Sequence, residues 1–250
     1  HRDLHSFPTR RSSDLGKTLL PIQKMTEDQK RFISDASHEL RTPLTGLKAL
    51  LEVSLRDPKL NLLEAKKVFK ESINQTNQLQ KLSDSLLELN HLQNNGSSLV
   101  FKSVSIKNLM FESIKKIKAK ADQKKISIKT KTISGKINVD NQKIEELFLI
   151  LLDNAIKYSP KSSQIKFIAQ RNNKKIIFKV IDQGIGIPPK DLPYIFNRFY
   201  RVDNSRTKNK VSGYGLGLSI AQKIAQQHQT TINVKSILNH GSTFSVSFQN

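Results

Sequence analysis

Two long amphipathic segments with a short break between them constrain the fold of this chain more than any other feature of its sequence. Residues 24–55 and 62–92 both repeat apolar side chains at steps of three and four, which is the period of an α-helix. The stretch RDPKLN (56–61) contains proline and asparagine, which end one helix and admit the next. The pattern predicts an antiparallel helical hairpin, whose apolar stripes are buried by dimerisation into a four-helix bundle.

The pattern changes after the polar stretch QNNGSS (93–98), where short apolar runs begin to alternate with helical periods. This predicts one α/β domain over 97–250, in which helices cover one face of a sheet. The fold class of the whole chain is therefore α + α/β. The expected strands are 99–102, 126–132, 136–139, 163–170, 175–181, 231–236 and 242–248, and the expected helices are 105–121, 141–157 and 215–228.

The composition excludes several classes of protein. The chain has no cysteine, so it has no disulfide framework and no thiolate metal site. Its longest apolar run, LFLILL (147–152), is too short to span a bilayer. The net charge is +21, with lysines concentrated over 102–136, which suits a polyanion, an anionic membrane or simply a solvated surface. Aromatic residues make up 6% and tryptophan is absent, so we expect no nucleic-acid partner.

One histidine in the first segment lies where it can react. In SDASHELRTPL (34–44), His38 falls about 140° from Ile33 around a helix, away from the apolar stripe. Thr42 lies one turn further on, and Glu39 follows His38 directly. Such a histidine is either an ordinary solvated residue or a nucleophile, whose imidazole the neighbouring carboxylate orients and deprotonates.

The stretch VIDQGIGIPP (180–189) is the first of two glycine-rich motifs. It places Asp182 at the end of a predicted strand, just before Gly184 and Gly186. Glycine lets the backbone approach a ligand closely, and the carboxylate can accept a hydrogen bond from an exocyclic amine such as that of adenine. The stretch is therefore either a simple turn or part of a nucleotide site.

The stretch SGYGLGLSI (212–220) is the second glycine-rich motif, and it precedes an apolar helix. Backbone amides at the start of a helix suit phosphate groups. The spacing of the glycines differs from that of a dinucleotide-binding fold. The three glycines and the leucine between the last two are Gly213, Gly215, Leu216 and Gly217.

The stretch LLDNAIKYSP (151–160) ends a predicted helix with polar side chains. Asn154 offers an oxygen for Mg²⁺, and Lys157 lies one turn along, where it can meet a phosphate. Tyr158 can lie against a base or a ribose. The alternative is an ordinary helix C-terminus, where lysine favours the helix dipole and proline follows the end.

Taken together, these motifs resemble those of bacterial two-component sensor histidine kinases. FISDASHELRTPLTGL (32–47) is similar to the phosphoacceptor box of that family, and LLDNAIKYS (151–159) to its asparagine box. DQGIGIP (182–188) and GYGLGLSI (213–220) resemble the two glycine boxes, and IFNRFYRVD (195–203) resembles the phenylalanine box. Five motifs in the same order and at similar spacing make a chance match very improbable.

The resemblance implies a HisKA-type dimerisation and phosphotransfer hairpin at 26–93 and an ATP-binding domain of the Bergerat type, an α/β sandwich, at 97–250. It implies that His38 attacks the γ-phosphate of ATP and that Glu39 is the general base. It also implies that Thr42 positions water for the reverse task, the dephosphorylation of the partner's aspartate.

The same resemblance implies roles for the residues of the second domain. Asn154 would hold Mg²⁺ and Lys157 the phosphates, while Tyr158 and Asp182 would contact adenine or its ribose. Residues 202–215 would form a mobile lid. The further nucleotide-binding candidates are two arginines for the γ-phosphate and a set of loop residues: Arg198, Arg201, Gly184, Gly186, Gly213, Gly215, Leu216 and Gly217.

Partners and location also follow from the resemblance. It implies a homodimer that transfers phosphate to the aspartate of a response regulator. It implies a membrane-anchored full-length protein with a cytoplasmic kinase core, of which this chain would be a soluble part. LPIQKMTEDQKRF (20–32) resembles a juxtamembrane linker, so 16–25 is expected to be a linker remnant. HSFPTRRSSDL (5–15) back-translates into what looks like a sequencing-adapter oligonucleotide, so 1–15 is expected to be an assembly artefact.

Two positions depart from the family pattern. Ile150 stands where the family usually has a second asparagine, which puts Mg²⁺ binding or turnover in doubt. QHQTT (227–231) replaces a His-Gly-Gly turn, where we expect a local change only. The first departure leaves a kinase-weak, phosphatase-dominant or pseudokinase scaffold as an alternative function. A related ATPase of the gyrase or mismatch-repair kind is a third hypothesis, although such proteins lack a histidine-bearing hairpin.

Overall fold

The computed structural model describes residues 12–93, 99–202 and 213–249. The chain forms two compact units that divide between Gln80 and Lys81. Within the described ranges, no helix is both long enough and apolar enough to cross a membrane.

The first unit is the predicted helical hairpin. It contains α1 (Ser12–Arg56) and most of α2 (Leu62–Gln93), so both helices are confirmed. Asn61 caps α2 reciprocally: its Oδ1 accepts from the Glu64 N–H at 3.0 Å, and its own N–H donates to the Glu64 carboxylate at 3.2 Å. The stretch 56–61 therefore both ends α1 and starts α2.

The hairpin carries large apolar side chains that stay exposed within one chain. Ile33, Leu44, Leu55, Phe69 and Ile73 are each more than half exposed. An apolar surface of this extent on two long helices is typical of an interface with a further helical pair.

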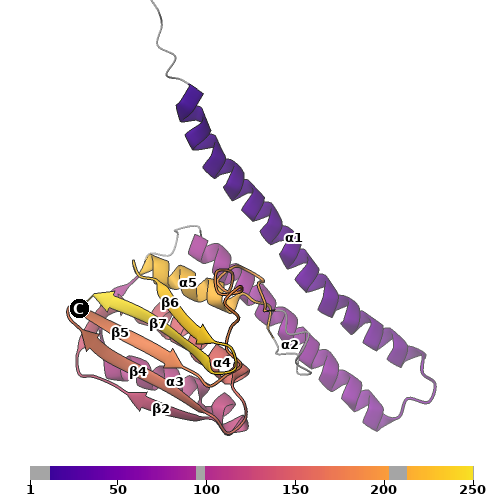
Figure 1. The fold of residues 1–250 in the computed structure, drawn as a ribbon. Coiled ribbons are helices and arrows are strands. Elements are labelled where there is room, and N and C mark those ends of the chain that lie inside the picture. Colours follow the sequence, from indigo (N-terminus) through magenta and orange to yellow (C-terminus); the bar gives the residue numbers. More distant parts are fainter. Residues whose placement is uncertain (1–11, 94–98, 203–212, 250) are drawn as a thin grey trace, which may run out of the picture. The chain divides into compact units, whose positions relative to one another are not determined.

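The second unit has two layers (Figure 1). Three helices lie on one face of a five-stranded sheet whose strand order is β2-β4-β5-β7-β6. β2 pairs with β4 in parallel, and the other neighbours in this sheet are antiparallel. The elements are β1 (Phe101–Ser105), α3 (Ile106–Gln123), β2 (Ser127–Lys131), β3 (Lys136–Asp140), α4 (Asn141–Tyr158), β4 (Gln164–Asn172), β5 (Lys175–Ile181), α5 (Gly217–Gln227), β6 (Ile232–Ile237) and β7 (Gly241–Gln249).

All three predicted helices and all seven predicted strands of this unit are present, with ends shifted by at most three residues. The predicted sheet with helices on one face is confirmed, and it contains five of the seven strands. β1 and β3 pair only with each other, as a separate antiparallel ribbon. Strand periodicity predicts that a segment is a strand but does not predict its pairing partner.

Three phenylalanine rings form the centre of the core between the layers. The ring centroid of Phe148 on α4 lies 5.1 Å from that of Phe167 on β4 and 4.8 Å from that of Phe178 on β5. All three side chains are fully buried. This cluster packs α4 against the middle of the sheet and so fixes where the C-terminal end of α4 lies relative to the sheet.

Both ends of α4 are fixed by side chains from other elements. At its start, the Asp140 carboxylate accepts from the N–H groups of Gln142 and Lys143, each at 3.1 Å. At its end, the Lys124 ammonium donates to the carbonyls of Ile156 at 2.9 Å and Lys157 at 2.8 Å. Burial, together with nearby Lys161, lowers the pKa of Lys124.

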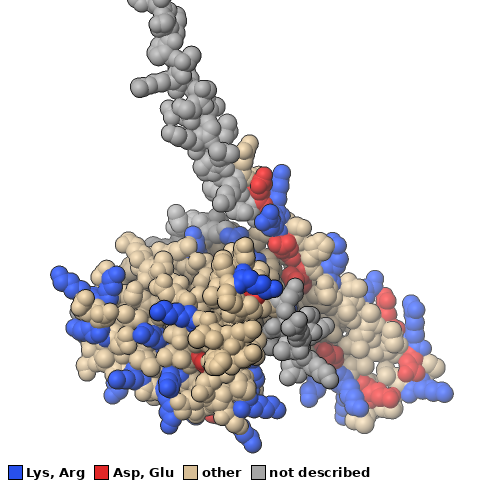
Figure 2. All heavy atoms as spheres, viewed as in Figure 1, with Lys and Arg blue, Asp and Glu red and all other residues tan. Residues whose placement is uncertain are grey.

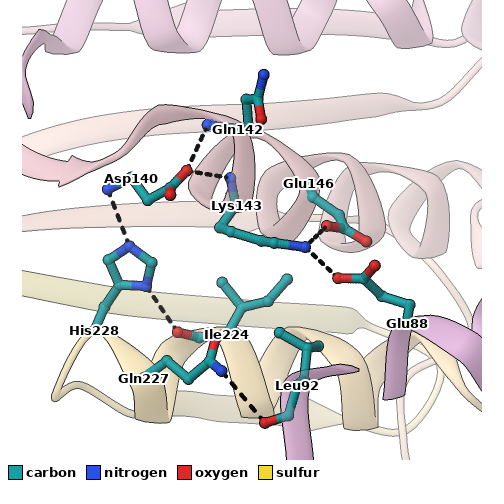
Figure 3. Close-up of polar contacts among 9 residues, drawn as sticks. All are labelled: Glu88, Leu92, Asp140, Gln142, Lys143, Glu146, Ile224, Gln227 and His228. Carbon is teal, nitrogen blue, oxygen red and sulfur yellow. Dashed lines mark hydrogen bonds and ion pairs between the residues drawn. The ribbon is translucent and has the colours of Figure 1, made fainter. Parts of the chain in front are cut away.

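The last turns of α2 belong to the second unit and contact α4 and α5 there (Figure 3). Lys143 forms ion pairs with Glu88 on α2 and with Glu146 on its own helix. Gln227 on α5 donates to the Leu92 carbonyl at 3.3 Å. Leu89 and Leu92 are buried, so this contact is both apolar and polar.

His228 joins the end of α5 to the start of α4 (Figure 3). Its Nε2 accepts from the Asp140 N–H at 3.1 Å, and its Nδ1 lies 2.9 Å from the Ile224 carbonyl, to which it donates. These two bonds require the neutral ring with its proton on Nδ1. Burial lowers the pKa of His228, while the Ile224 carbonyl and Asp140 oppose that effect.

We therefore expect the second unit to lose stability in acid through His228. The pKa of His228 lies below its ordinary value of 6.5 in the folded state. The stabilisation that the neutral His228 ring gives to the folded state is therefore complete above about pH 6.5. It is lost as the pH falls below that value and through the lower pKa of the folded state. Urea unfolding of the unaltered chain between pH 7.5 and pH 5 should show the free energy of unfolding falling as the pH falls. His228→Gln keeps an acceptor but cannot titrate, so an undiminished fall in that variant would contradict the assignment.

Gln229 takes a backbone conformation that favours glycine, with φ of 55°. It is the first residue after His228, in the departure from the His-Gly-Gly turn. The Gln229 N–H closes the turn onto the Gln226 carbonyl at 2.9 Å. The cost of the side chain in this conformation is about 1 kcal/mol.

Gln229→Gly should therefore raise the free energy of unfolding by about 1 kcal/mol, measured by urea titration. Gln226→Gly is the matched control, because Gln226 is exposed and helical, so glycine there should lower stability by roughly 0.5–1 kcal/mol. Equal effects of the two substitutions would show that the turn does not strain Gln229.

Candidate functional site

The carboxylate of Asp182 organises one end of the sheet in the second unit. Asp182 directly follows β5 and is buried. Its Oδ1 accepts from the Gly184 N–H at 2.7 Å and from the Ser242 N–H at 3.2 Å. Burial raises the pKa of Asp182, and these two N–H groups oppose the rise. Among the described residues, Oδ2 is left for a ligand.

The loop after Asp182 packs too tightly for any side chain at Gly186. Gly186 has φ of 67°, and a Cβ there would overlap the carbonyl of Ile237, the last residue of β6. The Ile185 N–H also donates to the Tyr158 carbonyl at 3.3 Å. The glycine loop is thus held between the end of α4 and the β6–β7 turn.

A cavity open to solvent lies at this point, with about 640 Å³ of space between its walls and the solvent in its mouth. Apolar and aromatic side chains form most of its wall, with few polar groups. The lining residues are Asn154, Tyr158, Asp182, Ile185, Gly186, Ile187, Ile195, Tyr200, Arg201, Val202, Leu218, Ser242 and Phe244.

Asn154 and Tyr158 reach the cavity from the last turns of α4. Burial raises the pKa of Tyr158, and the charge of Arg201 opposes the rise. Ile150, one turn before Asn154, points toward the start of α5, since a Cβ at Gly217 would lie 3.3 Å from its Cγ2. With isoleucine at position 150, the amide side chain that α4 supplies to the cavity lining is that of Asn154.

Lys157 lies beside the second glycine motif, where a Cβ at Gly213 would be 3.7 Å from its Nζ. The Asp153 carboxylate holds this ammonium at 2.6 Å and holds Lys120 of α3 at 2.8 Å. Burial raises the pKa of Asp153, but the two ammonium groups outweigh it and keep that pKa below its usual range. The ion pairs aim Lys157 along the edge of the site.

The segment after the first glycine loop consists of consecutive turns that form the outer wall. Tyr200 donates its hydroxyl to the Asp191 carboxylate at 2.7 Å, which fixes the position of neighbouring Arg201. Gly215 has φ of 73°, and a Cβ there would lie 2.7 Å from the Tyr200 carbonyl oxygen. The second glycine motif therefore packs directly on this wall.

The structure brings together five of the predicted site residues as lining of one cavity: Asn154, Tyr158, Asp182, Gly186 and Arg201. The others in this unit are not among the lining residues: Lys157, Arg198, Gly184, Gly213, Gly215, Leu216 and Gly217. Of the predicted lid over 202–215, residues 203–212 lie outside the described part of the chain.

Sequence reasoning missed the contribution of β7. Ser242 and Phe244 line the cavity from that strand, and Ser242 also bonds Asp182. The strand pairing places Thr243 opposite Ile181, so the start of β7 meets the end of β5. No local signal in the sequence marks this pairing, because the two segments are about 60 residues apart.

His38 lies on α1 in the first unit and is exposed. Glu39 follows it and is partly buried, and Thr42 donates its hydroxyl to the His38 carbonyl at 3.2 Å. The helix runs on through Pro43. Proline has no N–H, so the Glu39 carbonyl has no helical donor at this point.

Comparisons with known proteins match both units. Residues 28–95 match the His Kinase A (phospho-acceptor) domain, and residues 139–250 match the histidine kinase-, DNA gyrase B- and HSP90-like ATPase. The chain is 38% identical over 227 residues to the signal transduction histidine-protein kinase ArlS of Staphylococcus aureus, covering 91% of this chain. It spans 50% of the length of that relative.

Solved structures of similar fold belong to the same group. The Acinetobacter baumannii histidine kinase AdeS is 26% identical, with a TM-score of 0.69, covering 85% of this chain and 97% of the other. The histidine kinase ThkA, solved in complex with the response regulator protein TrrA, is 21% identical and has a TM-score of 0.70. It covers 93% of this chain and 66% of its own, and at that identity it supports the fold alone.

The histidine-bearing hairpin, the cavity around Asp182 and these matches agree. The chain belongs to the sensor histidine kinases, and it contains a phospho-acceptor hairpin followed by an ATPase domain of that family.

Proposed function

We propose that this chain is the catalytic core of a two-component kinase, which transfers the γ-phosphate of ATP to His38 and from there to an aspartate of a response regulator. The observation that carries the proposal is that one chain contains two features: an exposed histidine beside a carboxylate on a helix, and an open cavity lined by Asp182, aromatic and apolar side chains. A purely structural domain requires neither.

The chemistry at His38 follows from its exposure. One nitrogen of the neutral imidazole attacks the γ-phosphorus, so an N–P bond forms while the bond from phosphorus to the bridging oxygen breaks and ADP leaves. The proton on the other ring nitrogen passes to the Glu39 carboxylate. Because His38 is exposed on a helix, the phosphate donor and later the receiving aspartate can both reach it.

The cavity suits an adenine nucleotide. The free oxygen of Asp182 can accept a hydrogen bond from the exocyclic amine of adenine, and Tyr158 with the apolar wall can enclose the base. The phosphates would extend toward Lys157 and the second glycine motif, whose backbone amides begin α5. Arg201 lines the cavity and Arg198 does not, so we favour Arg201 of these two arginines for the γ-phosphate.

Mg²⁺ fits these residues through Asn154. With Ile150 turned toward Gly217, Asn154 supplies the amide oxygen from α4. One protein oxygen is sufficient, since Mg²⁺ commonly keeps several waters and binds mainly to the phosphates of the substrate. When bound, the ion would neutralise charge on those phosphates. We therefore favour the active kinase over the pseudokinase scaffold.

Thr42 would serve the reverse reaction, hydrolysis of the phosphorylated aspartate on the regulator. Its hydroxyl donates to the His38 carbonyl, so its oxygen lone pairs can accept from a water and orient it. Dimerisation through the exposed apolar surface of the hairpin completes the proposed assembly. The family resemblance assigns this core to the cytoplasmic side of a membrane in the whole protein.

The first test is the covalent product. The chain incubated with γ-labelled ATP and Mg²⁺ should acquire an acid-labile, base-stable label, and His38→Gln should remove it. Glu39→Gln should slow labelling by about 10²–10⁴-fold, because it removes the general base. His91→Gln is the control, since His91 is also an exposed histidine on a helix. Label that survives in His38→Gln would contradict the proposal.

The second test separates two lysines that share one carboxylate. Lys157→Ala should weaken ATP binding about 5- to 30-fold in calorimetry, because it removes the ammonium beside Gly213. Lys120→Ala breaks the other ion pair of Asp153 but lies on α3, so the affinity should change less than about threefold. Equal losses would show that Asp153, rather than Lys157, accounts for the effect.

A further inference from the structure

The face of the five-stranded sheet that the helices leave uncovered carries a regular array of lysines. Residues on alternate positions of the strands point away from the helices, as their exposure shows. We call this surface the lysine face. Its basic residues are Lys129 and Lys131 on β2, Lys166 on β4, Lys175 and Lys179 on β5, and Lys235 on β6.

The strand register places these lysines in rows across the sheet. One row runs from Lys129 through its partners Lys166, Ile181 and Thr243 to Lys235. With strands about 4.8 Å apart, this row is about 19 Å long. The next row contains Lys131 and Lys179, separated by Ile168. The positive charges are therefore spread over the whole width of a nearly continuous surface.

No negative charge interrupts the array. The five strands contain no aspartate or glutamate, and within the described residues none of the six lysines forms an ion pair. Figure 2 shows this side of the second unit with many blue side chains and few red atoms. Unpaired like charges at this density repel one another, so the surface favours an anionic occupant.

The uncharged side chains of the lysine face are aliphatic, hydroxyl-bearing or amide groups, among them Gln170 and Asn233. Ile168, Ile177 and Ile181 are partly exposed between the lysines, and β7 contributes threonine and serines. The Lys-rich, Ile-containing composition suits lipid headgroups, because lysine stems can lie along apolar surface while the ammonium groups meet phosphate. The face is less suited to binding nucleic acid, because it has neither an aromatic ring for stacking nor an arginine for contacts with base edges.

We propose that the lysine face docks the second unit on a membrane surface rich in anionic lipids. The occupant is a plane of headgroups, which matches the width and the even charge of the sheet. The effect is to hold the ATPase unit by its sheet, on the side opposite to α3, α4 and α5. This binding does not depend on the nucleotide or on His38.

The first test is co-sedimentation of the whole chain with phospholipid vesicles. Vesicles containing phosphatidylglycerol should bind the chain, and phosphatidylcholine vesicles should not. The triple variant Lys166→Gln, Lys179→Gln and Lys235→Gln should lower the partition coefficient roughly 10- to 100-fold. The matched control removes the same charge elsewhere, with Lys107→Gln, Lys115→Gln and Lys190→Gln, all exposed and outside the strands. It should keep most of the binding.

The second test locates the contact directly and uses the absence of native cysteine. A polarity-sensitive fluorophore on Ser245→Cys would sit on β7 within the lysine face, and the same fluorophore on Lys115→Cys would sit on α3. Phosphatidylglycerol vesicles should shift the emission of the first label to the blue and leave the second unchanged.

Three results would overturn the proposal. They are equal losses of binding in the two triple variants, a larger spectral shift on α3 than on β7, and no binding to anionic vesicles at low salt. Binding of a short DNA duplex, measured for the same variants, tests the alternative occupant. If the triple variant of the lysine face lost DNA binding while vesicle binding stayed unchanged, the face would belong to nucleic acid instead. Vesicle binding that is lost with the lysine face and kept in the matched control supports the lipid surface.

Discussion

The carboxylate of Asp182 joins three parts of the second unit that lie far apart in the sequence. It follows β5, accepts the N–H of Gly184 in the glycine loop, and accepts the N–H of Ser242 at the start of β7. Because a buried carboxylate is costly unless its oxygens are satisfied, these bonds fix the loop and the strand end relative to each other. The floor of the cavity exists because this constraint is met, and one carboxylate oxygen remains for the ligand.

The rest of the site depends on where α4 ends. The phenylalanine cluster sets the height of the helix above the sheet, and side chains from other elements hold its two ends. Asn154 and Tyr158 then reach the cavity, while Lys157 reaches its edge. The glycine loop completes the link, since the Ile185 N–H bonds the carbonyl of Tyr158. Under the proposed function, structural residues such as Lys124 and Asp140 would contribute to nucleotide binding without touching the nucleotide.

Local patterns in the sequence predicted the helices, the strands and the position of most site residues, because periods of 3.6 and 2 are properties of single elements. Such local patterns could not predict contacts between elements that are far apart in the sequence. The i,i+4 spacing of Asp153 and Lys157 is visible in the sequence, but the second partner, Lys120, comes from α3. The separate β1–β3 ribbon and the part that β7 plays in the cavity arise in the same way from strand pairing.

The central claim is that the cavity built on Asp182 selects an adenine nucleotide for the kinase reaction. Calorimetric titration of the whole chain with ATP and with GTP in Mg²⁺ tests it most directly. Adenine presents an amine where guanine presents a carbonyl, which the carboxylate would repel. We predict binding of ATP with little binding of GTP, and a loss of about 10-fold or more for ATP with Asp182→Asn. Equal affinity for the two nucleotides, or undiminished ATP binding by Asp182→Asn, would contradict the account.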